Sequence, residues 1–189
     1  MFPLTPQTPY IASLPGNHDI GVADTSSPSA LARFKKYFGE PSSEFQAGDF
    51  KIIMLDTVSL SAEQTPMISR QPQEFLNSLR STQAPEPRIL LTHIPLFRPE
   101  GTSCGPLRES KVPIHVAKGY QYQNVLWPDL SKRVVDIVRP LAVFSGDDHD
   151  YCFVQHNYGG MKIPEHTVKS FSWAMVYSSI AEADFEGSE

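Results

Sequence analysis

Three short polar segments, each following an apolar run, constrain the fold of this chain more than any other feature. Residues 16–19 (Gly-Asn-His-Asp) follow the run 10–14, His93 follows 88–92, and residues 146–149 (Gly-Asp-Asp-His) follow 141–144. Apolar runs of this length, bounded by turn residues, are typical of buried strands. In open α/β folds the carboxyl ends of such strands meet at one edge of the sheet, where ligands bind. The pattern therefore predicts an α/β fold with the three segments gathered at that edge.

The side chains in these segments suit a divalent metal. An amide (Asn17), imidazoles (His93, His149) and a carboxylate (Asp147) are donors used by Mn, Fe and Zn. Each residue alone has an ordinary explanation: Asn17 as a turn residue, His93 as a hydrogen-bonded core histidine, and the acidic cluster as a solvated turn. Together they favour metal-assisted phosphoester chemistry.

Neighbouring residues add candidate roles in catalysis. His18 is a candidate general acid because imidazole titrates near neutral pH, and Asp19 is a candidate to orient it. Asp150 is a candidate hydrogen-bond partner for an imidazole ligand. Arg98 is a candidate phosphate clamp, with an ordinary surface arginine as the equal alternative.

Composition and charge limit the classes of partner that the chain is expected to bind. The chain has 189 residues, a net charge of −5 and no cluster of Lys and Arg, which argues against nucleic-acid binding. No signal peptide and no run of about 20 apolar residues is present in this sequence. The two cysteines, Cys104 and Cys152, are either free thiols or one disulfide, and the sequence leaves both open.

The chain pattern predicts the main elements. We expect helices at 29–38 with Ser29 as the cap, around Phe75 with Pro72 in the first turn, and at 128–139. We expect strands at 10–14, 88–92, 141–144 and 168–173, and hairpins at 45–57 and 153–166. Residues 17–19 are expected on a loop after Pro15 and Gly16, and residues 94–127 are expected to form a long irregular loop. The remaining histidines, which are His115, His156 and His166, are expected at the surface or in loops.

Together the three segments resemble the calcineurin-like metallophosphoesterase superfamily, whose pattern ends in Gly-Asn-His-Asp/Glu, a lone His and Gly-His-x-His. The longer strings 14–21, 91–98, 145–152 and 167–172 are similar to the fungal branch of the GPI-anchor-remodelling phosphodiesterases. The resemblance implies a four-layer α/β/β/α sandwich formed by a partial domain over residues 1–175, with a divergent polar tail at 176–189.

The resemblance also implies roles for individual residues. Asn17, His93 and Asp147 would hold the second metal, His149 the first, and His18 would protonate the leaving oxygen. Mn is the expected metal, with Fe or Zn as alternatives, in a centre that is dinuclear in the family. The implied reaction removes ethanolamine phosphate from a mannose of the GPI glycan, in a membrane-associated enzyme of the endoplasmic reticulum or Golgi.

The superfamily's first two motifs, Asp-x-His and Gly-Asp-x-x-Asp, are not found before Gly16 in this sequence. We therefore expect a domain that lacks its first strands and the bridging carboxylate, with a partial metal site and little or no activity as an isolated chain. The alternative is a non-catalytic remnant or gene-model fragment that binds at most one metal weakly. A further alternative is a partner chain that supplies the missing strands.

Overall fold

A computed structural model describes residues 13–21, 26–80, 86–119 and 122–170 of the chain. Two short N-terminal helices, α1 (Asn17–Ile20) and α2 (Pro28–Phe38), precede the hairpin of β1 (Ser43–Ala47) and β2 (Phe50–Leu55). Helices α3 (Thr57–Leu60) and α4 (Pro66–Ser78) then lead to β3 (Arg88–Thr92). The hairpin, β3 and the helix at 29–38 are confirmed, although Ser27 rather than Ser29 caps α2 by accepting the Ala30 N–H at 3.4 Å.

The second half of the chain adds the loop, one helix and three more sheet strands. The loop contains a two-stranded ribbon of β4 (Lys118–Gly119) and β5 (Tyr122–Gln123) and is otherwise irregular where described, as expected. Helix α5 (Pro128–Val138) and strand β6 (Ala142–Ser145) follow, and then the hairpin of β7 (Cys152–Tyr158) and β8 (Met161–Thr167). These elements also confirm the sequence pattern.

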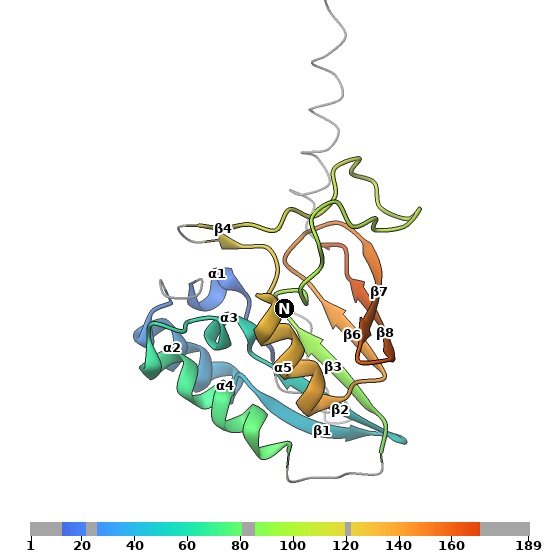
Figure 1. The fold of residues 1–189 in the computed structure, drawn as a ribbon. Helices are drawn as coiled ribbons and strands as arrows, with labels where there is room; N and C mark the ends of the chain where they lie inside the picture. The colour runs from blue at the N-terminus through green and yellow to red at the C-terminus, as the bar shows by residue number, and fades with distance from the viewer. Residues whose placement is uncertain (1–12, 22–25, 81–85, 120–121, 171–189) are drawn as a thin grey trace, which may run out of the picture.

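The main sheet has six strands in the order β1-β2-β3-β6-β8-β7. The four central strands run parallel, and the edge strands β1 and β7 pair antiparallel with their neighbours. Parallel pairing between sequence-distant strands requires crossovers, which α4 and α5 provide on one side of the sheet (Figure 1). This mixed sheet with flanking helices is the expected α/β class and is consistent with a metallophosphoesterase-like sandwich.

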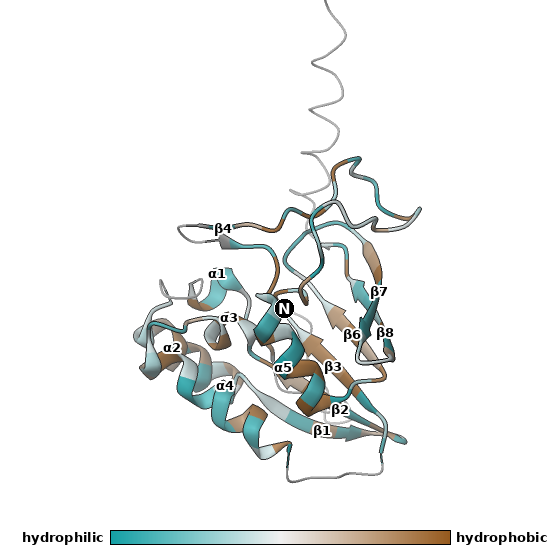
Figure 2. Ribbon diagram, in the orientation of Figure 1, coloured by the Kyte–Doolittle hydropathy of each residue, from teal (hydrophilic) through white to brown (hydrophobic). Residues whose placement is uncertain are grey.

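The core lies between these helices and the sheet. Alternate strand residues point inward, including Ile53, Leu90 and Val143, and they pack against apolar positions of α4 and α5 such as Leu76 and Val134. Figure 2 shows β3 and β6 in hydrophobic colours and α4 as largely hydrophilic, as expected for a helix with one buried face. The periodicity of the sequence thus accounts for the core.

Several expectations about local structure were wrong or lie outside the described residues. Residues 17–20 form a helical turn rather than a loop, and Pro72 lies inside α4 rather than in its first turn, which is occupied by Pro66. The expected first strand at 10–14 lies mostly outside the described residues. In the expected last strand, residues 168–170 are not extended in a sheet, and 171–173 lie outside the described part, as does the tail at 176–189. No helix of the described residues has the length and apolarity to cross a membrane.

Candidate metal centre

Three of the predicted ligands converge at the carboxyl end of the parallel strands. Asn17 begins α1, His93 follows β3, and Asp147 follows β6, which is hydrogen-bonded to β3. The Nε2 atom of His93 lies 3.1 Å from Oδ1 of Asn17 and 3.3 Å from Oδ1 of Asp147. Residues separated by 76 and 54 positions in the chain thus place their donor atoms together, as the strand-end pattern predicted.

The spacing of these donors suits a cation. Ligands at right angles around a metal, each at about 2.1 Å, are separated by about 3 Å, which is close to the observed distances. Without a metal, a protonated Nε2 can donate to both oxygens; with a metal, the same three atoms would turn to the cation. No group of three His, Cys, Asp or Glu side chains suited to a metal occurs among the described residues, so the amide of Asn17 is needed to complete the trio.

Close backbone approach shapes the pocket around His93. A Cβ atom on Gly16 would lie 2.9 Å from Cε1 of His93, so only glycine fits there without displacing the ring. On the other side, the N–H of Gly146 donates to the carbonyl of His93 at 2.9 Å. The two glycines of the motifs therefore serve to bring α1 and the β6 loop against the same imidazole.

The loop after β6 is held in an unusual backbone conformation. Asp147 and His149 have φ angles of 68° and 66°, in the left-handed region that costs a non-glycine residue about 1–3 kcal/mol. Asp148 lies between them, with its carboxylate bonded to Arg108. Burial raises the pKa of Asp148, and the Arg108 guanidinium opposes this shift.

The side chains of the other predicted site residues do not join the trio of Asn17, His93 and Asp147. His18 is exposed at the start of α1, and the Asp19 carboxylate accepts the Gly16 N–H at 2.8 Å, which stabilises the turn. His149 is exposed, and within the described residues its side chain has no contact with the trio. Asp150 accepts the N–H groups of Glu109 and Ser110, a different partner from the imidazole that we expected.

Arg98 lies in the interior, where its guanidinium is 1% exposed and bonded to Glu165 at 2.9 Å. Glu165 also bonds His156 at 2.7 Å and the N–H of Leu96 at 3.0 Å. This geometry does not support a phosphate clamp at Arg98. It also corrects the expectation for His156, which is buried on β7 rather than at the surface. Burial opposes ionisation of Glu165, but the bond from His156 and the charge of Arg98 hold its pKa below the usual value.

His166 is also not a loop residue: it is half-buried on β8 and stacks on Phe144. His115 is exposed in the loop, as expected, where its Nδ1 lies 2.8 Å from Glu100.

Two features of this region were missed from the sequence. Asp56, at the end of β2, is fully buried; its Oδ1 accepts the Ser59 N–H at 2.8 Å, and its Oδ2 has no partner among the described residues. Burial raises the pKa of Asp56 to about 6. Asp56 directly follows the apolar run 50–55, so the strand-end pattern that identified the other segments also marks it. The second feature is the Cys104–Cys152 disulfide, which resolves the choice that the sequence left open.

The comparisons with known proteins fit this geometry. No protein-family model matches the chain. It is 48% identical over 180 residues to cell division control protein 1 of Saccharomyces cerevisiae, which covers 93% of this chain and 37% of that protein. It is 31% identical over 182 residues to mouse metallophosphoesterase 1, with 84% and 44% covered, and 28% identical over 170 residues to a metallophosphoesterase 1 homolog of Caenorhabditis elegans, with 86% and 45% covered. The chain thus spans less than half the length of these relatives. Their similarity across most of this chain supports its assignment to a metallophosphoesterase family.

Proposed function

We propose that this chain serves in metal-dependent hydrolysis of a phosphodiester. The observation that carries the proposal is the convergence of Asn17 Oδ1 and Asp147 Oδ1 on His93 Nε2, at 3.1 and 3.3 Å. The relatives named metallophosphoesterase 1 support the same reaction class and do not favour a non-catalytic remnant.

Each residue of the site has its own proposed role in the reaction. A divalent cation held by the trio would supply positive charge for a phosphoryl oxygen. His18 is exposed next to Asn17, and its backbone N–H donates to Asn17 Oδ1 at 3.0 Å. From there it can give a proton to a leaving oxygen. Asp19 stabilises the turn that carries both residues.

The proposed substrate is an ethanolamine phosphodiester of the GPI glycan, in the endoplasmic reticulum or Golgi. The sequence strings described above suggest this substrate. The Cys104–Cys152 disulfide is in keeping with an oxidising secretory compartment. Mn is the proposed metal because its preference for oxygen and imidazole donors matches the trio, with Fe or Zn as alternatives.

The described residues offer one cation three ligands and no bridging carboxylate, so the isolated chain should bind one Mn²⁺ weakly and turn over little substrate. Binding therefore tests the function better than turnover. We would titrate Mn²⁺ by electron paramagnetic resonance of the free ion. We would then follow Mn-induced broadening of the ³¹P signal of glycerophosphoethanolamine, a soluble ethanolamine phosphodiester.

The decisive variant is Asp147→Asn, with Asp49→Asn as the control because Asp49 is an exposed turn residue of the same charge. We expect Asp147→Asn to weaken Mn²⁺ binding at least about 10-fold and to abolish the broadening. Asp49→Asn should leave both unchanged. Equal effects of the two substitutions would refute a metal site at the trio. Mn²⁺ binding without broadening would refute the phosphodiester as ligand.

Hydrolysis of bis-p-nitrophenyl phosphate gives a separate check. Rapid Mn-dependent turnover by the isolated chain, lost in His18→Ala, would contradict the expected low activity while supporting the role of His18.

A further inference from the structure

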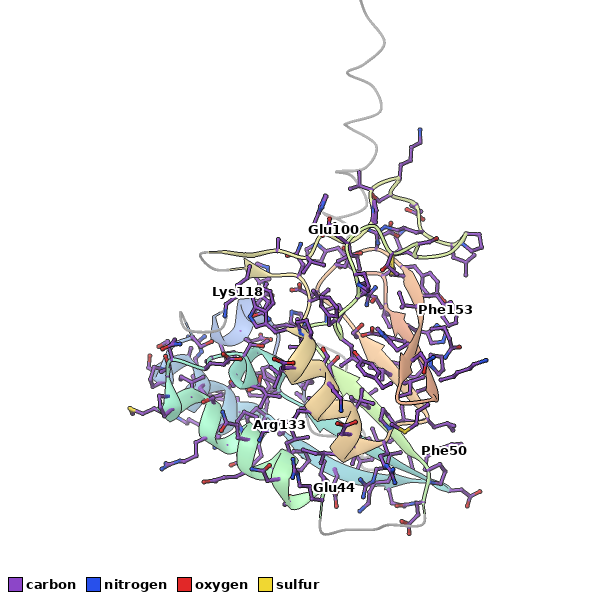
Figure 3. The ribbon with its side chains drawn as sticks, in the orientation of Figure 1. Glu44, Phe50, Glu100, Lys118, Arg133 and Phe153 are labelled. Atoms are coloured by element: carbon purple, nitrogen blue, oxygen red, sulfur yellow. A yellow bond between two sulfur atoms is a disulfide. The ribbon has the colours of Figure 1, made fainter. Side chains whose placement is uncertain are left out.

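A segment of the long loop is fastened to the metal-ligand loop at several points. We call residues 104–112 the strap. Its first residue is joined to β7 by the Cys104–Cys152 disulfide, and the Phe153 N–H donates to the Cys104 carbonyl at 3.0 Å. Figure 3 shows Glu100 and Lys118, from the same loop, at the end of the molecule opposite Glu44 and Phe50 of the β1–β2 hairpin. The loop that carries the strap thus lies over the end of the sheet that carries the site.

The strap makes its most specific contact through Arg108. Both terminal nitrogens of Arg108 face the Asp148 carboxylate, with Nη1 in close contact with Oδ2 and Nη2 3.4 Å from Oδ1. The Nε of Arg108 donates to the Val112 carbonyl at 2.9 Å, which fixes the guanidinium within the strap. The side chains of Arg108 and Asp148 are 10% and 15% exposed, so the pair is shielded from water.

A second contact stabilises the same arrangement. The Oδ2 atom of Asp150 accepts the N–H groups of Glu109 at 3.0 Å and Ser110 at 2.8 Å. Two carboxylates of the ligand loop, Asp148 and Asp150, are therefore both satisfied by the strap, one by a side chain and one by backbone.

Asp147 and His149, on either side of Asp148, are both in the left-handed conformation. A backbone in this conformation persists where surrounding contacts over-determine it. Asp147 is also the residue whose Oδ1 meets His93 Nε2. The Arg108 contact thus acts on the position directly next to a proposed ligand.

We propose that Arg108 is a positioning residue for the metal site: by clamping Asp148, it holds Asp147 in the conformation that faces His93. The proposal rests on the proposed function in so far as Asp147 is a metal ligand. Arg108 itself lies outside the ligand trio and is assigned no contact with substrate.

The charge of Arg108 and its positioning role predict opposite changes in Mn²⁺ affinity, so a substitution of Arg108 can distinguish them. Removing a cationic side chain near a metal site should tighten Mn²⁺ binding, whereas loss of positioning should weaken it. We would compare Arg108→Gln with Lys111→Gln, which removes the same charge from an exposed side chain of the strap. We expect Mn²⁺ affinity to fall about 10-fold in Arg108→Gln and to stay level or rise slightly in Lys111→Gln. Arg108→Lys keeps the charge but loses the paired geometry, so its Mn²⁺ affinity should lie between those of Arg108→Gln and wild type.

Amide hydrogen exchange of metal-free protein separates this proposal from the function on which it rests. We expect exchange in residues 146–151 to speed up in Arg108→Gln and not in Lys111→Gln, with the rest of the sheet unchanged. Unchanged exchange in 146–151 would overturn the proposal even if Mn²⁺ binds. Faster exchange with unaltered Mn²⁺ affinity would overturn it too, because Arg108 would then order the loop without positioning a ligand. Failure of the wild-type chain to bind Mn²⁺ would refute the site itself and with it the positioning role.

Discussion

Replacing Arg98 by methionine tests whether its guanidinium is a buried structural charge or a phosphate-binding group. The guanidinium donates to Glu165 at 2.9 Å and to Thr167 Oγ1 at 3.4 Å, and Nη1 lies 2.8 Å from Cys152 Sγ. Methionine retains much of the apolar stem but removes the charge. Within the described part of the chain, Glu165 then keeps only its bonds with His156 and with the Leu96 N–H.

The expected cost follows from these contacts. Removing one partner of a buried ion pair costs about 3–5 kcal/mol, because the other charge is left uncompensated. The low end applies here for two reasons. His156 remains bonded to Glu165, and the Nε of Arg98, which is buried without a partner among the described residues, disappears in the variant. We therefore expect the free energy of unfolding to fall by about 3 kcal/mol, which shifts the urea midpoint by about 1.5 M at a slope of about 2 kcal/mol per M.

The measurement is urea unfolding followed by circular dichroism at pH 7 with the disulfide intact. Arg70→Met is the control, because Arg70 is 77% exposed and 4.0 Å from Glu74, and its loss should change stability by less than about 0.5 kcal/mol. A loss below about 1 kcal/mol in Arg98→Met would refute the buried pair. If the same variant also lost phosphodiester binding, the original phosphate-clamp hypothesis would be restored.

The pH dependence of this difference gives an independent check. The folded pKa of Glu165 is lowered, so its contribution is present above its unfolded pKa and is lost as pH falls through the folded value. Arg98 is one cause of the lowering. The stability gap between wild type and Arg98→Met should therefore be full above about pH 4.5 and should narrow below it. A gap that is constant down to pH 3 would contradict the charge-based explanation.

Three further outcomes can be measured with the same protein. Replacing Cys104 and Cys152 by alanine should lower the free energy of unfolding, measured in denaturant, by up to about 4 kcal/mol, since the disulfide closes a loop of 48 residues. An unchanged free energy of unfolding would mean that the disulfide does not form. Asp56→Asn should gain stability relative to wild type as pH rises from 4 to 6, because the pKa of Asp56, raised to about 6, means that wild type loses about 3 kcal/mol on ionising this buried group. Urea midpoints of metal-free protein across that pH range would show the gain. A difference in midpoint between the two proteins that does not change with pH would refute the prediction. Gly16→Ala should weaken Mn²⁺ binding about 10-fold, because the added Cβ displaces His93, while the unfolding midpoint changes little. An unchanged Mn²⁺ affinity would show that the close approach of Gly16 to His93 is not needed for metal binding.

The sequence predicted the sheet and the convergence of Asn17, His93 and Asp147, because apolar runs that end in polar residues are local patterns. Apolar runs ending in polar residues located β3 and β6, and the register between them then brings His93 and Asp147 to one edge. Helix α1 was missed because a four-residue turn has no periodicity, and it forms through the Asp19 contact with the Gly16 N–H.

The buried charges were harder to predict, because pairing across the sheet is not encoded locally. Arg98 and Glu165 are 67 residues apart, and nothing near Arg98 in sequence shows that its partner lies on β8. One signal was available: alternation along β8 places Glu165 on the same face as the buried Ile163, so an inward-facing carboxylate needed a cation. The same reasoning would have placed His156, which shares a face of β7 with the buried Val154, in the interior.

The proposed amide ligand at position 17 would have a consequence for substrate binding. One carboxylate, one neutral imidazole and one amide carry a single negative charge, so a divalent cation would leave the centre with a single positive charge, which attracts a phosphodiester anion. A carboxylate at this position would bind the metal more strongly but cancel that charge. Asn17→Asp should therefore raise the affinity for Mn²⁺ while lowering the affinity of the loaded chain for glycerophosphoethanolamine, as followed by the broadening of its ³¹P signal. Affinities that rise or fall together would show that charge at this position does not set the balance between metal and substrate.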